Sequence, residues 1–170
     1  MRIAIIGAGN MGGAIARALA KCDTLSDATI VCTAKSQATL DRLHSQQPRL
    51  QLTLDNREAA TDADIVLLAV KPWLMREVVE QLRPALDLER QIIISVAAGI
   101  SLDDLATMLG CEQATIFRLI PNTAIEVMSS MTFVCSRGAT EEQQQTVMQI
   151  FNQTGCAMLV TEDKIEAGTA

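Results

Sequence analysis

Short apolar runs alternate with segments of helical periodicity along the whole chain. The runs are rich in Ile, Val, Leu and Ala and have the length of strands; they lie at residues 3–6, 28–33, 50–54, 63–70, 92–96, 115–119, 131–135 and 157–160. In most of the intervening segments, apolar residues recur at intervals of three and four, as on one face of a helix. This alternation is typical of βαβ units. We predict an α/β fold with a doubly wound, mostly parallel sheet and helices on both faces.

Local signals support this arrangement. Helices are expected at about 10–22, 36–46, from Pro72 onward, 101–108 and 141–151. Pro72 suits the first position of a helix, where its missing N–H is not needed, and Ser101 suits an N-cap. The run at 63–70 is apolar with almost no alternation, which indicates a central strand covered on both faces.

Gly7, Gly9 and Gly12 stand between the first apolar run and the first helix. In this setting the first glycine permits a tight turn, the second lets the backbone approach a pyrophosphate, and the third lets the helix pack closely on the strand. The helix N-terminus then offers free N–H groups and a partial positive charge to phosphates. The pattern predicts a Rossmann-type dinucleotide site; the alternative is a glycine-rich turn that binds nothing. The loop residues expected to contact the cofactor are Gly7, Ala8, Gly9, Asn10, Met11 and Gly12.

The end of the second predicted strand bears on the choice of dinucleotide. NAD sites carry an Asp or Glu there, which bonds the ribose 2′-hydroxyl. This chain has Thr33, Ala34, Lys35 and Ser36, and its first acid further on is Asp41. Two hydroxyls and a cation suit a 2′-phosphate, so we expect NADP(H) in preference to NAD(H), with use of NAD(H) left open. The alternative is that Lys35 and Ser36 simply begin a solvated helix.

Ligands of open α/β sheets bind at the carboxyl ends of the strands, and further candidates follow other strands. Lys71 precedes a proline and is therefore held extended at the mouth of the crevice, either as a ligand contact or as a surface lysine. Asn56 either reaches the adenosine edge or caps the next helix. We expect Asn122 to bond loop backbone and Arg118, within a strand, to satisfy a carboxylate.

Composition narrows the function classes. The net charge of −6 argues against non-specific nucleic-acid binding. We expect no membrane span, since no apolar run reaches about 18 residues, and a cytoplasmic location, since the N-terminus begins a strand rather than a signal peptide. Five cysteines without CxxC spacing predict buried, reduced thiols, and the single His44 is expected to be a solvated surface residue. No acid–base pair and no metal site are evident.

The organisation predicted from 170 residues is one domain with the beginning of another. Residues 1–160 form the NADP-binding domain. Residues 161–170 look like a helix start with a capping Thr and acids in its first turn, and we expect them to begin a second, truncated domain.

Four blocks together resemble the pyrroline-5-carboxylate reductase family: Ile6–Ile15, Ala69–Pro72 (AVKP), Ser95–Ile100 (SVAAGI) and Arg118–Thr123 (RLIPNT). The resemblance covers essentially the whole chain. Ala124 departs from it, because a second proline is typical there. A weaker resemblance links the chain to hydroxyacid-dehydrogenase-like and F420-linked NADP reductase domains.

The resemblance implies hydride transfer from NAD(P)H to the C=N carbon of 1-pyrroline-5-carboxylate, which gives L-proline. It also implies a helical second domain that forms a homodimer or higher oligomer and carries the substrate-carboxylate loop, so this chain alone is expected to be inactive. Glu162 falls where the family has a substrate-contacting acid. Beyond the glycine loop, the implied cofactor contacts are Thr33, Ala34, Lys35, Ser36, Asn56, Ala69, Val70, Lys71, Pro72 and Ala97.

Two alternatives remain. One is a different NADP-linked Rossmann reductase, acting on a 3-hydroxy acid or on F420. The other is a nucleotide-sensing or partner-binding module without turnover.

Overall fold

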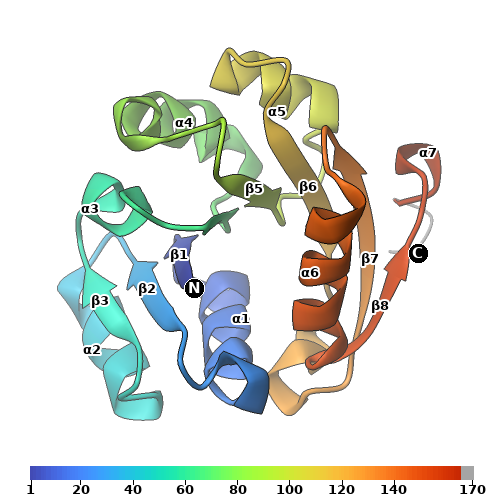
Figure 1. Ribbon diagram of the computed structural model, residues 1–170. Helices are drawn as coiled ribbons and strands as arrows, with labels where there is room; N and C mark the ends of the chain where they lie inside the picture. The colour runs from blue at the N-terminus through green and yellow to red at the C-terminus, as the bar shows by residue number, and fades with distance from the viewer. Residues whose placement is uncertain (166–170) are drawn as a thin grey trace.

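The computed structural model describes residues 1–165. Its strands form one eight-stranded sheet in the order β3-β2-β1-β4-β5-β6-β7-β8 (Figure 1). All neighbouring strands are parallel except β6 and β7. The predicted doubly wound, mostly parallel sheet is therefore confirmed. The strands are β1 (Arg2–Ile6), β2 (Thr29–Thr33), β3 (Gln51–Thr53), β4 (Ile65–Leu68), β5 (Ile92–Ser95), β6 (Thr115–Ile120), β7 (Ser130–Arg137) and β8 (Gly155–Leu159).

The helices cover both faces of the sheet. They are α1 (Asn10–Ala20), α2 (Gln37–Gln46), α3 (Asn56–Ala60), α4 (Met75–Leu82), α5 (Leu102–Leu109), α6 (Glu141–Asn152) and α7 (Glu162–Ile165). Apolar residues of α1, α2 and α6 pack in one core cluster, whereas those of α3, α4, α5 and α7 pack in the other. The short 3₁₀ helices are η1 (Asp23–Leu25), η2 (Pro72–Leu74), η3 (Arg83–Ala85) and η4 (Thr123–Val127).

The central strands are buried on both faces, which explains their unbroken apolar sequence. In β1, Ile3 and Ile5 belong to one core cluster, while Ala4 and Ile6 belong to the other. All four residues of β4 are buried as well. A strand whose two faces meet two helical layers has no solvent side, so polar alternation is lost.

The predicted helix starts hold in detail. Pro72 occupies the first turn of η2, and Lys71 before it is extended with φ −63° and ψ 145°. Ser101 caps α5: its hydroxyl oxygen accepts a hydrogen bond from the Asp104 amide, and the Asp104 carboxylate accepts one from the Ser101 amide. This capping box satisfies two N–H groups that would otherwise have no partner within the helix. His44 is exposed, as predicted.

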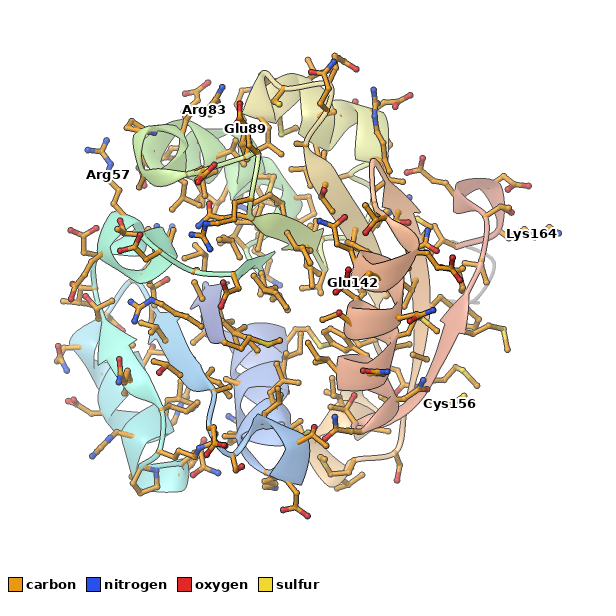
Figure 2. The ribbon with its side chains drawn as sticks, viewed as in Figure 1. Arg57, Arg83, Glu89, Glu142, Cys156 and Lys164 are labelled. Carbon is orange, nitrogen blue, oxygen red and sulfur yellow. The ribbon has the colours of Figure 1, made fainter. Side chains whose placement is uncertain are left out.

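One prediction about the cysteines is wrong. Cys22, Cys32 and Cys135 are buried free thiols and Cys111 is half-buried, but Cys156 is exposed on the outer strand β8 (Figure 2). Met158 and Leu159 of the same strand are also exposed. The apolar sequence of β8 correctly predicted a strand. It did not predict that, within residues 1–165, one side of this strand is exposed.

The segment after β8 packs on the rest of the domain as far as it is described. Ile165 of α7 is fully buried in the second core cluster. The remaining residues of the expected second-domain start, 166–170, lie outside the described part of the chain. Among residues 1–165, no helix has both the length and the apolar character needed to cross a membrane.

Candidate dinucleotide-binding site

Three glycines shape the loop between β1 and α1, each for a different reason. Gly7 has φ +94°, and a Cβ there would lie 2.8 Å from Val70 Cγ1. At Gly12 a Cβ would lie 2.2 Å from the Gly7 carbonyl oxygen, so the helix can approach the strand only without a side chain. Around Gly9, no described atom outside Gly9 and its chain neighbours lies within 4 Å of the Cβ position. The second glycine therefore leaves open space at the N-terminus of α1.

Thr33 fastens this loop to the end of β2. Its hydroxyl oxygen accepts a hydrogen bond from the Gly7 amide at 3.1 Å, and its carbonyl accepts one from the Ala8 amide at 2.6 Å. The side chain is only 1% exposed. Thr33 thus supports the glycine loop from behind instead of presenting its hydroxyl at the surface.

The turn after β2 contains a cation, Lys35, and no carboxylate. Lys35 is exposed and lines the hollow described below. The Ser36 hydroxyl caps α2 by accepting a bond from the Thr39 amide at 3.3 Å. Ser36 therefore begins a helix, as the predicted alternative has it. Lys35 is the polar side chain of this turn that lines the hollow.

A hollow of about 580 Å³ lies at the carboxyl edge of the sheet. It runs from the end of β2 past the glycine loop to the end of β5. Its lining residues are Gly7, Ala8, Gly9, Asn10, Met11, Ala34, Lys35, Thr39, Ala69, Val70, Lys71, Pro72, Leu74, Val96, Ala97 and Ala98. The structure thus brings most of the predicted cofactor contacts to one surface.

Four of those predicted contacts do not line this hollow: Thr33 and Asn56 line the adjoining hollow described below, and Gly12 and Ser36 line neither. Gly12 is buried against Gly7 and Ala69, where it permits close packing, and Ser36 is occupied by its helix cap. Thr39 and Leu74 line the hollow but were missed. Their signal was available, since each lies on the first turns of a helix that begins at the carboxyl edge.

A second hollow of about 230 Å³ adjoins the first. Both are lined by Gly7, Ala34, Lys35, Val70 and Leu74. The other residues of the second hollow are Ile6, Thr33, Leu54, Asn56, Glu77, Val78 and Gln81. Sequence reasoning anticipated Thr33 and Asn56 but not the contribution of α4, because nothing in the sequence states which face of α4 meets the end of β3.

Asn56 lines this hollow and is not a helix cap. The cap of α3 is Asp55, whose Oδ1 accepts bonds from the Arg57 amide at 2.8 Å and the Glu58 amide at 3.2 Å. The capping alternative for Asn56 is therefore wrong by one residue. With Asp55 at the cap, Asn56 is the first helical residue and its side chain is available to the hollow.

The loops on the β5 and β6 side are held by internal bonds. Asn122 caps η4 by accepting a bond from the Ala124 amide at 3.2 Å, which confirms its loop role. Arg118, 4% exposed, lies with its Nη1 3.6 Å from Glu162 Oε1, which confirms that it satisfies a carboxylate. The same Glu162 oxygen accepts a bond from the Leu102 amide at 2.7 Å.

Burial argues against Cys32 and Cys135 as nucleophiles near neutral pH. Burial raises the pKa of Cys32 to about 12 and that of Cys135 to about 11. A buried thiol with a raised pKa stays protonated and inert. Within residues 1–165, no group of three or more His, Cys, Asp or Glu residues is arranged to hold a metal ion.

Together, the strand–glycine loop–helix unit, the strand order 3-2-1-4-5-6 and the hollow at the carboxyl edge define a Rossmann-type dinucleotide-binding domain. The chain belongs to the family described as NADP oxidoreductase, coenzyme F420-dependent, whose model matches residues 2–99.

The similarity to curated and solved proteins extends over almost the whole chain. The chain is 33% identical to pyrroline-5-carboxylate reductase of Escherichia coli, over 96% of the chain and 60% of that protein. The structure of a pyrroline-5-carboxylate reductase from Coxiella burnetii matches with a TM-score of 0.85 and 30% identity, over 96% of this chain and 60% of that chain. The NADP-bound pyrroline carboxylate reductase of Plasmodium falciparum matches with a TM-score of 0.85 and 23% identity, over 99% of this chain and 61% of that chain.

These matches confirm the resemblance that the sequence blocks predicted. The chain spans about 60% of the length of each of these three relatives.

Proposed function

We propose that this chain is the NADP(H)-binding domain of a pyrroline-5-carboxylate reductase. The observation that carries the proposal is the 33% identity to the Escherichia coli enzyme over 96% of the chain. The geometry of the carboxyl edge supports it independently, because a hollow of about 580 Å³ passes in front of the open Gly9.

The chain's residues fit a bound NADP(H). Its diphosphate would lie on the N-terminus of α1, where Gly9 leaves room and where the first amides of a helix have no partner within the helix. Lys35 would contact the 2′-phosphate, at a strand end that has no acid to repel it. Ala97 and Ala98 would face the nicotinamide, since they line the opposite end of the hollow. The proposal includes NAD(H) as a second cofactor, because no side chain among residues 1–165 excludes it.

The nicotinamide supplies the hydride when NADPH is bound, and the protein's task is to orient it. The hydride adds to the C=N carbon of 1-pyrroline-5-carboxylate, whose nitrogen is protonated in the reactive form, and L-proline results. Glu162 enters the proposal as the acid that contacts the substrate. Because its Oε1 already accepts from the Leu102 amide, it would reach the protonated ring nitrogen of the substrate with its other oxygen.

The proposal includes a homodimer or higher oligomer that acts in the cytoplasm on a small-molecule substrate, with no nucleic-acid or membrane partner. It assigns residues 1–160 to cofactor binding and 161–170 to the beginning of a helical dimerisation domain. The relatives support this division by their greater length, since the chain spans 60% of the Escherichia coli protein. We expect the 170-residue chain to bind NADPH and to lack turnover.

The test has two parts. Calorimetry on the chain measures NADPH and NADH binding. A polypeptide extended at its C-terminus to the length of the relatives is then assayed for NADPH oxidation with 1-pyrroline-5-carboxylate. Binding with substrate-dependent oxidation supports the proposal, whereas substantial turnover by the 170-residue chain would remove the need for a second domain.

A second candidate follows from the family description, which names coenzyme F420. The same assay run with F420 in place of 1-pyrroline-5-carboxylate separates the two. If only F420 is reduced, or if only a 3-hydroxy acid or its keto form reacts, that compound would take the place of the imine as the proposed substrate. Tight NADPH binding without reduction of any of these compounds would favour a nucleotide-sensing module.

A further inference from the structure

A pair of polar side chains lines the α4 side of the second hollow. Glu77 and Gln81 lie on consecutive turns of α4, and Gln81 Nε2 donates a hydrogen bond to Glu77 Oε1 at 3.3 Å. Both residues are exposed. The pair therefore presents a carboxylate acceptor and an amide donor side by side at a wall that is otherwise rich in apolar groups.

The apolar part of the same hollow suits a flat ring. Leu54, Val70, Leu74 and Val78 line it together with the polar pair, and its volume is about 230 Å³. Leu54 is 54% exposed although it lies beside this hollow. Apolar walls with a few convergent polar groups are the usual composition of a small-molecule pocket.

Arg57 links α3 and α4, the two helices that contribute residues to the second hollow. Its Nε donates to the Gln81 carbonyl at 2.7 Å and so links α3 to α4. Figure 2 shows the Arg57 side chain projecting from α3 beside α4, at the left edge of the molecule. This bond uses only the backbone carbonyl of Gln81. The side-chain amide of Gln81 is oriented by its own hydrogen bond to Glu77.

The position of the hollow identifies its occupant, and this step rests on the proposed function. If the diphosphate lies at Gly9, the nicotinamide at Ala97 and the 2′-phosphate at Lys35, the adenine base is the group at the Lys35 end that can enter the second hollow, since both hollows share Lys35 and Val70. The Glu77 carboxylate repels a phosphate from this end but not a neutral base.

We propose that Glu77 and Gln81 read the amino-substituted edge of adenine. The Glu77 carboxylate accepts a hydrogen bond from the exocyclic 6-amino group, and the Gln81 amide donates one to the neighbouring ring nitrogen N1. Leu54, Leu74 and Val78 contact the faces and edge of the ring. Hypoxanthine reverses this pattern, because it has an oxygen at position 6 and a proton on N1. A site built to bond one pattern rejects the other by leaving its polar groups unpaired.

The test compares two reduced cofactors that differ only in this edge: NADPH and its hypoxanthine counterpart, deamino-NADPH. Calorimetry measures the Kd of each for the 170-residue chain. We expect the wild-type chain to bind NADPH about tenfold more tightly, a modest ratio because both side chains are exposed. In Glu77→Ala and Gln81→Ala, the ratio is expected to fall to about twofold or less.

Glu80→Ala is the matched control. Glu80 lies on the same helix, is exposed and carries the same charge, but it does not line either hollow. It is expected to keep the wild-type ratio. Thermal unfolding of all variants checks that α4 remains folded.

The outcomes separate this proposal from the one on which it rests. If neither cofactor binds, the NADP(H)-binding function itself is wrong and this inference falls with it. If NADPH binds but deamino-NADPH binds equally well, only the adenine-reading role is overturned. The same conclusion follows if Glu77→Ala retains the wild-type ratio or if Glu80→Ala loses it.

Discussion

At the scale of single residues, Gly9 and Gly12 separate a binding requirement from a packing requirement. A methyl group at Gly12 would meet the Gly7 carbonyl oxygen at 2.2 Å, whereas one at Gly9 would meet no described atom within 4 Å outside its chain neighbours. We expect Gly9→Ala to leave the melting temperature unchanged and to weaken NADPH binding at least about tenfold, because its methyl occupies the path of the diphosphate. Gly12→Ala should lower the free energy of unfolding by about 1–3 kcal/mol through overpacking.

Thermal unfolding and calorimetry, run on both variants, check this pair of predictions. Wild-type NADPH affinity in Gly9→Ala would mean that the diphosphate does not cross this loop. Wild-type stability in Gly12→Ala would mean that α1 can move away from β1 without cost.

Lys35 is the residue on which cofactor preference depends. It is the exposed cation at the end of β2, while Thr33 is turned inward to hold the glycine loop and Ser36 caps α2. We expect Lys35→Ala to weaken NADPH binding about tenfold and NADH binding by no more than about twofold, since only NADPH carries the phosphate that Lys35 would pair with. Lys21→Ala, which removes an exposed charge at the end of α1, is the control. Equal losses for both cofactors in Lys35→Ala would remove the 2′-phosphate role.

At the scale of elements, the N-terminus of α5 carries a titratable cap. Hydrogen bonds from the Ser101 side chain and backbone hold the pKa of Asp104 below its ordinary value of 3.8. A lowered pKa in the folded state adds stability above the ordinary value and loses it as the pH falls below that value. We expect Ser101→Ala to lower the melting temperature by about 3 °C at pH 7, and the difference from wild type to shrink as the pH falls below about 4.

Melting curves at several pH values measure this difference. Thr107→Ala, an exposed substitution in the same helix, should keep the wild-type pH dependence. A Ser101→Ala deficit that is the same at pH 3 and pH 7 would show that Asp104 takes no part in the cap.

The elements also show what sequence patterns can and cannot predict. The unbroken apolar run of β4 identified a central strand, because a strand buried on both faces has apolar residues at every position. The cap of α3 was misplaced by one residue, since Asp55 and Asn56 are both good capping residues and only the backbone decides between them. The exposure of Cys156 and the contribution of Glu77 to a hollow depend on which elements meet, and local periodicity does not contain that information.

At the scale of the whole molecule, Glu162 joins three segments that are far apart in sequence. Its carboxylate pairs with Arg118 in β6 and accepts from the Leu102 amide at the start of α5, while Ile165 in the same short helix is fully buried. The bond to Leu102 also fixes the end of the loop that carries Ala97 and Ala98 along the large hollow. Docking of α7 and the shape of the cofactor site are therefore linked through one side chain.

We expect Glu162→Gln to lower the free energy of unfolding by about 2 kcal/mol, less than the full cost of breaking a buried pair because Glu162 is one-third exposed. The amide can still accept from Leu102, so the loss reports mainly the charge beside the buried Arg118. Hydrogen exchange should rise first at residues 159–165, since α7 has few other anchors. Asp163→Asn, an exposed charge on the same helix, is the control and should leave both measurements at wild-type values. If the two variants behave alike, α7 is held by the packing of Ile165 and not by its charge.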